Sequence, residues 1–139
     1  MDILNVLEKA TQINSVSGSE NEIRKFISDN VKKYCDELLV DAMGNLIAHK
    51  KGSGKKIMFA AHMDEIGIIV TDIDDKGFVR FSSVGGLNLR NLVNLRVRFA
   101  NGVEGVIGAE EESFKDKPAI SKLYVDLGAA DKKEAEKTV

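Results

Sequence analysis

The first part of the chain carries apolar residues at the spacing of two amphipathic helices. One set predicts a helix over about residues 2–12: Ile3, Val6, Leu7 and Ala10. A capping box formed by Ser19 and Glu22 then predicts the start of a second helix, whose apolar face continues to about Tyr34. Each pattern has a single apolar stripe, so we expect both helices to lie on a surface.

The spacing changes from helix to strand after these two segments. Two short apolar runs, Leu38–Val40 and Leu46–Ala48, flank a loop that contains Gly44 and predict a β-hairpin. The run IMFAA, residues 57–61, has five consecutive apolar residues without polar alternation. This pattern predicts a strand buried on both faces in the middle of a sheet covered by helices. We expect it to be the most buried strand of the chain.

Strand-like segments separated by polar or glycine-containing turns occupy most of the remaining chain. They are Ile66–Ile73, Phe78–Phe81, Val93–Phe99, Val103–Ile107 and Leu123–Leu127. An Asn101-Gly102 pair between two of them predicts a hairpin turn of type I′. The order of elements predicts an α/β region over residues 1–72, followed by a small antiparallel β-rich domain over residues 73–139. A last helix, opened by Asp131 and Glu134, has little apolar face, so we expect it to pack on sequence that follows.

Composition and charge narrow the classes of partner. The 139 residues are 43% apolar and 30% charged, which is enough apolar material for a core. The net charge of −2 comes from 20 basic and 22 acidic residues scattered along the chain, so we expect neither a nucleic-acid nor a membrane partner. Cys35 is the only cysteine, and the N-terminus lacks the features of a signal peptide. A cytoplasmic location is therefore the expectation.

His62 and Asp64 are the candidate chemical groups. They follow the buried apolar run and lie two residues apart, so on a strand their side chains would point to the same side. A carboxylate in that place can accept the spare ring N–H of a metal-bound imidazole. The end of a central strand is also where ligand sites occur in α/β sheets. The alternative is a partly buried histidine that hydrogen-bonds an acid, and the tripeptide alone does not decide between the two.

The wider stretch resembles a known family. AHMDEIGIIV, preceded by DAMGNLIAHKKGSGKKIMFA and followed by GFVRFSSVGG and LYVDLGA, closely resembles the start of the cytosolic dinuclear-metal aminopeptidases. These include glutamyl and deblocking aminopeptidases, and some members are labelled endoglucanase or cellulase M. The resemblance extends to about Thr138. It implies the N-terminal part of an aminopeptidase-type α/β catalytic domain, followed by a small barrel-like inserted domain that mediates homo-oligomerisation, and a peptide substrate.

The resemblance also implies roles for single residues. His62 matches the first metal-ligand histidine, and Asp64 matches the catalytic-site aspartate that supports it, whereas Glu65 has no assigned role. The complete enzymes use two divalent metal ions, zinc or cobalt. Their other metal ligands and their catalytic glutamate lie beyond the inserted domain. The resemblance therefore implies that this chain is an N-terminal fragment, inactive alone, that does not bind the pair of metal ions.

No other residues of the sequence replace the missing ligands. His49 lies at a lysine-rich hairpin end and is expected to be a solvated surface residue. Glu110–Glu112 are expected to be a solvated run of charge in a loop. Glycoside hydrolysis by Asp64 and Glu65 fails on geometry, because neighbouring strand residues point to opposite faces.

A non-catalytic β-module used for self-association is the alternative function. In either case the chain is expected to contain only part of an α/β sheet. Such a part exposes apolar surface and unpaired strand edges, so self-association is expected.

Overall fold

The chain forms two compact units. The computed structural model describes residues 2–110 and 119–139. The first unit comprises Met1–Glu65 and the second Ile66–Val139. The sequence placed the boundary near Asp72, which lies inside the first strand of the second unit. Within the described residues, no helix combines the length and the apolar character needed to span a bilayer.

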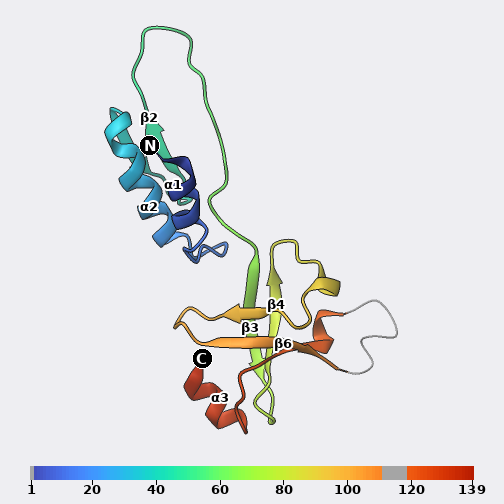
Figure 1. The fold of residues 1–139 in the computed structure, drawn as a ribbon. Coiled ribbons are helices and arrows are strands. Elements are labelled where there is room, and N and C mark those ends of the chain that lie inside the picture. Colours follow the sequence, from blue (N-terminus) through green and yellow to red (C-terminus); the bar gives the residue numbers. More distant parts are fainter. Residues whose placement is uncertain (1, 111–118) are drawn as a thin grey trace. The chain divides into compact units, whose positions relative to one another are not determined.

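Two helices and a hairpin make up the first unit (Figure 1). Its elements are α1 Ile3–Ala10, α2 Asn21–Val31, the 3-10 turn Lys32–Tyr34, β1 Glu37–Val40 and β2 Leu46–His49. The hairpin is antiparallel, with Glu37 opposite His49 and Val40 opposite Leu46, so this part of the sequence prediction is confirmed. Arg24 of α2 donates its Nε–H to the carbonyl of Gly44 at 2.8 Å and so ties the helix to the hairpin loop.

The two helices begin differently from each other. The carboxylate of Asp2 accepts hydrogen bonds from the backbone N–H of Leu4 and of Asn5, so it caps α1. The predicted capping box at Ser19 is wrong, because α2 begins after Glu20, which has no side-chain hydrogen bond to the helix. The Glu20 carboxylate is instead used in the preceding turn, where it accepts the N–H of Gly18 at 2.6 Å.

The predicted central strand is the clearest error of the sequence analysis. No strand is assigned among residues 55–64, and the side chains of its apolar run are open to solvent: Ile57 is 77%, Met58 87% and Phe59 93% exposed. A strand buried on both faces needs a hydrogen-bonded neighbour at each edge and a covering layer on each face. Among the described residues, β1 and β2 pair only with each other and provide no such neighbour. The segment therefore has the composition of a core strand and lacks its partners.

The second unit is a five-stranded antiparallel sheet in the order β3-β4-β7-β6-β5 (Figure 1). Its strands are β3 Gly67–Ile73, β4 Val79–Val84, β5 Arg96–Arg98, β6 Glu104–Ala109 and β7 Leu123–Asp126. The described residues of this unit also form two 3-10 turns, Leu89–Asn91 and Ile120–Lys122, and the helix α3, Lys132–Thr138. All five predicted strands are present. The third is shorter than predicted, because Asn94 adopts a positive φ of 69° that interrupts the extended chain.

This sheet has a core of its own. Val125 of β7 lies opposite Val79 of β4 on one side and Ile107 of β6 on the other, and all three side chains are fully or almost fully buried. The other buried members of this cluster are Phe81, Leu92 and Leu123. The first unit differs: among its described residues only Ile23 and Ser15 are buried. Most of the apolar stabilisation therefore lies in the second unit.

The β5–β6 turn differs from the predicted type I′ turn. The N–H of Phe99 donates to the carbonyl of Val103, and the N–H of Gly102 donates to the carbonyl of Phe99, which makes a three-residue loop. Gly102 has a positive φ of 87°, whereas Asn101 does not, and type I′ requires both. The carboxamide of Asn101 instead accepts the N–H of Val103 and donates to the carbonyl of Thr138 in α3.

Helix α3 packs within the second unit, contrary to expectation. Asp131 caps it by accepting the N–H of Glu134 at 2.9 Å, as the sequence predicted. Ala135 is fully buried, and Val139 packs against the core of the sheet. The buried Ala135, the contact of Val139 and the hydrogen bond from Asn101 to Thr138 together hold this short helix on the unit.

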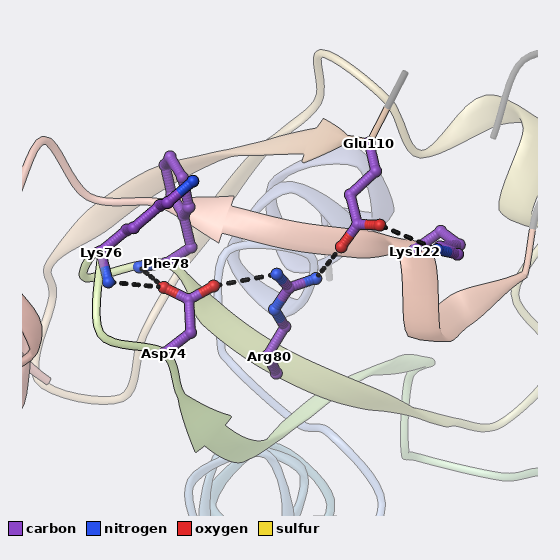
Figure 2. Close-up of polar contacts among 6 residues, drawn as sticks. All are labelled: Asp74, Lys76, Phe78, Arg80, Glu110 and Lys122. Atoms are coloured by element: carbon purple, nitrogen blue, oxygen red, sulfur yellow. Dashed lines mark hydrogen bonds and ion pairs between the residues drawn. The ribbon is translucent and has the colours of Figure 1, made fainter. Parts of the chain in front are cut away.

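A charged network joins four parts of the second unit (Figure 2). The guanidinium of Arg80 on β4 donates to Asp74 in the β3–β4 turn and to Glu110 after β6, each at 2.9 Å. Lys122 donates to the other oxygen of Glu110 at 3.0 Å. Glu110 is thus paired, so the prediction that it belongs to a solvated run of charge is wrong. Glu111 and Glu112 lie outside the described residues.

The network lowers the pKa of both carboxyl groups. Partial burial alone would raise the pKa of Asp74, but hydrogen bonds from Arg80 and from the N–H groups of Phe78 and Lys76 outweigh that effect. The pKa of Glu110 is lowered first by Lys122 and then by Arg80. Both groups therefore stay ionised below the pH at which ordinary carboxyls become protonated.

Replacing Arg80 should make the second unit less sensitive to acid. Carboxyls with a lowered folded-state pKa stabilise the fold above their unfolded-state pKa of about 4, and this contribution is lost as pH falls through the folded-state values. We expect Arg80→Met to lower the free energy of unfolding at neutral pH, with a difference from wild type that shrinks toward about pH 3. Urea titrations of the wild type and of Arg80→Met, repeated from neutral pH down to about pH 3, measure the two free energies of unfolding at each pH.

Arg98→Met is the matched control, because Arg98 pairs with Glu104 on the exposed β5–β6 hairpin. Its effect at neutral pH should be the smaller one. An Arg80→Met deficit that stays constant from neutral to acid pH would contradict the role given to the network.

Candidate functional site

His62 and Asp64, the two residues predicted from the sequence, contact each other. Nδ1 of His62 lies 2.9 Å from the backbone oxygen of Asp64 and 3.2 Å from its Oδ1. Both oxygens are acceptors, so the proton of the neutral ring lies on Nδ1 and Nε2 carries the lone pair. The imidazole is 86% exposed. The pair forms without the strand geometry from which it was predicted, because neither residue lies in a strand.

Ser17 holds the second oxygen of Asp64. Its hydroxyl donates to Oδ2 at 2.5 Å across 47 positions of sequence. This hydrogen bond is the main cause of the lowered pKa of the Asp64 carboxyl, and His62 adds a smaller contribution. Sequence reasoning missed Ser17, because a serine in the turn NSVSGSE has many local roles and nothing in the pattern indicates contact with a residue so distant.

A second pair of contacts joins the segment that contains Ser17 to the segment that contains Asp64. The N–H of Glu65 donates to the carbonyl of Ser15 at 2.9 Å, and the N–H of Ser15 donates to Oε1 of Glu65 at 3.0 Å. Val16 and Glu65 form a parallel bridge, and Ser15 is buried. Glu65 thus has a structural part in the site, although it was given no role from the sequence.

The described residues do not make a complete metal centre. Among residues 2–110 and 119–139, no group of three or more histidine, cysteine, aspartate or glutamate residues is arranged to hold an ion. His49, the other histidine, is half exposed at the end of β2 and contacts Glu37 at 3.2 Å. A catalytic zinc ion usually takes three protein ligands. The described residues of the site provide one imidazole with its supporting carboxylate, which is fewer protein ligands than such an ion takes.

Comparison with known proteins shows the family. Residues 44–139 match the family described as M42 glutamyl aminopeptidase. The chain belongs to this family. A protein of Acetivibrio thermocellus that is named as an aminopeptidase is 53% identical over 140 residues, which cover 99% of this chain and 42% of that protein.

Solved structures of longer proteins have the same fold over this chain. An endoglucanase from Thermotoga maritima is 38% identical with a TM-score of 0.82, and the match covers 96% of this chain and 41% of that one. The TET1 peptidase of Pyrococcus horikoshii, described as assembling into a tetrahedron or a large octahedral shell, is 38% identical with a TM-score of 0.79. That match covers 98% of this chain and 43% of the other. The chain thus spans about two fifths of the length of the relatives it matches.

These comparisons confirm the resemblance inferred from the sequence, and the endoglucanase label also occurs, on the Thermotoga maritima structure. They also confirm the fold class: an α/β region followed by a β-rich unit, as in the matching part of the longer proteins. M42 aminopeptidases are metal-dependent, in agreement with the expected cofactor class. The roles of His62 and Asp64 stay predictions.

Glu65→Ala should loosen the site without unfolding the second unit. The change removes the acceptor of the Ser15 N–H, which lies in a buried residue, and a hydrogen bond of this kind is worth about 1 kcal/mol. We expect the first unit to unfold at lower urea concentration, as followed by NMR signals of α2, whereas signals of β7 are unchanged. Glu65→Gln keeps an acceptor oxygen and should recover most of the loss. Equal effects of both substitutions, or none of either, would contradict this account.

Proposed function

We propose that this chain is the N-terminal part of a metal-dependent aminopeptidase and that His62 supplies one ligand of its metal centre. Family membership supports the reaction class. The observation that carries the assignment is the contact of His62 Nδ1 with Asp64, which leaves Nε2 as the lone-pair nitrogen of an exposed ring. Ligating histidines characteristically donate their other N–H to a carboxylate or carbonyl oxygen in this way.

In the complete protein the reaction is the removal of N-terminal residues from peptides. Two divalent ions, zinc or cobalt, would polarise the scissile carbonyl and make a bound water acidic when present. This chain would contribute His62 as a ligand and Asp64 as the group that orients the imidazole. The remaining ligands and the general base are proposed to come from sequence matching the rest of the longer relatives. The free Cys35 fits the cytoplasmic location expected from the sequence.

Self-association through the second unit is a second candidate function. The separate core of Val79, Ile107 and Val125 favours it, because a unit with its own core can serve as a module. Ile69 and Val70 on the edge strand β3 are also exposed, which provides apolar surface for a partner copy. The TET1 peptidase, a structural relative, assembles into shells, which supports homo-oligomerisation as a proposal for this chain. The two functions concern different units and are compatible in one protein.

Zinc added to the isolated chain should perturb His62 before any other histidine. One imidazole is a weak site, because a zinc ion usually takes three protein ligands, so we expect weak binding at His62. NMR of the histidine ring signals during a zinc titration measures this, with His62→Ala and His49→Ala as the matched pair of variants. The chain should show no turnover of aminoacyl-anilides with zinc, cobalt or manganese, because no group of three or more potential ligands or bases surrounds His62 among the described residues.

Two results would count against the proposal. Zinc that shifts the ring signals of His49 and leaves those of His62 unchanged would remove the ligand assignment. Metal-dependent turnover that disappears in His62→Ala would contradict the proposed inactivity of the chain and show that groups other than His62 and Asp64 complete the site.

A further inference from the structure

The carboxylate of Asp64 is shared between two donors, one on each oxygen. Oδ2 accepts the hydroxyl of Ser17, and Oδ1 faces Nδ1 of His62. The terminal torsion of an aspartate is broad and roughly two-fold, so it does not itself fix the plane of the carboxylate. The bond to Ser17 supplies that constraint. A rotation that carried Oδ1 away from His62 would also break the short bond from Ser17.

Ser17 is itself held in a defined turn. The N–H of Ser19 donates to the carbonyl of Val16 at 2.8 Å, which makes residues 16–19 a four-residue turn. Gly18 is its third residue and has a φ of 91°, the position at which a type II turn requires a positive φ. The N–H of Gly18 is held by Glu20, the cap residue of α2. These two hydrogen bonds therefore fix the turn that carries the hydroxyl of Ser17.

The turn and the His62 segment are also kept in register. The paired hydrogen bonds between Ser15 and Glu65 lie two residues before Ser17 and one residue after Asp64. With that register fixed, the Ser17 hydroxyl meets the carboxylate of Asp64 and not another group of the segment. The geometry connects the turn to the imidazole through a single carboxylate.

We propose that Ser17 is a positioning residue for His62. By holding Asp64 it keeps a negative charge at Nδ1, which favours the tautomer that leaves Nε2 free to bind a metal ion. The backbone oxygen of Asp64 also contacts Nδ1, but it carries no net charge. Loss of Ser17 should thus weaken the preference for this tautomer and not abolish it. The role toward a metal rests on the proposed function, whereas the control of the tautomer does not.

The test compares Ser17→Ala with Ser17→Thr, which restores a hydroxyl, and with Ser19→Ala, a change in the same turn. Ring ¹⁵N shifts of His62, recorded with the imidazole neutral, report which nitrogen is protonated. We expect protonation at Nδ1 in the wild type, a larger share at Nε2 in Ser17→Ala, and wild-type values in the other two variants. Zinc titration of the same samples should show affinity at His62 lowered by up to about tenfold in Ser17→Ala, because Ser17 acts through Asp64, and restored in Ser17→Thr.

The outcomes separate this inference from the proposed function. Unchanged tautomer and zinc affinity in Ser17→Ala overturn the inference, even where zinc binds His62. Equal effects of Ser17→Ala and Ser19→Ala also overturn it, because they indicate general loosening of the turn. A tautomer that depends on the hydroxyl supports the positioning role; if zinc nevertheless fails to perturb His62 in the wild type, the ligand assignment is what fails.

Discussion

Unequal burial of apolar side chains determines what each part of this chain can do alone. The second unit buries a continuous cluster that joins β4, β6 and β7, and each large apolar side chain buried there contributes about 1.5–3 kcal/mol. In the first unit, α1 exposes Ile3, Leu4 and Leu7, and the run beginning at Ile57 is open to solvent. The first unit has apolar residues in the pattern of a core but lacks the surfaces that would cover them.

Hydrogen bonds therefore carry much of the order in the first unit, including the candidate site. The Glu65–Ser15 pair and the Arg24–Gly44 contact join segments that no apolar cluster joins, and each such bond adds only about 0.5–1.5 kcal/mol net. In addition to these hydrogen bonds, Asp64 contacts both Ser17 and His62. The result is an oriented imidazole without a complete metal centre among the described residues.

Local sequence signals predicted most of the fold. The β1–β2 hairpin and the five strands of the second unit follow from alternation and turn residues, which are properties of neighbouring positions. The central strand failed because burial depends on partners that composition cannot provide. The type I′ prediction failed because an Asn-Gly pair also fits a three-residue loop, in which the asparagine uses its carboxamide to bind Val103 and Thr138. The capping box failed because Glu20 lies nearer to the start of α2 than Ser19.

The sequence likewise predicted some residues of the candidate site and missed others. His62 and Asp64 were found from the sequence because their chemistry is encoded in a spacing of two residues. Ser15 and Ser17 were missed because their roles depend on a contact made across about fifty positions, and such a contact leaves no local pattern. The lowered pKa of Asp64 likewise has its first cause in the distant Ser17.

Hydrogen exchange resolved to single amides tests the central claim, that the chain has one self-sufficient core and an incomplete first unit. For the isolated chain we predict slow exchange at the buried residues Ile107, Leu123 and Val125 of the paired strands β6 and β7, and exchange at the unprotected rate throughout residues 57–61. Protection of residues 57–61 equal to that of β7 would show that this run has found strand partners, and it would contradict the account.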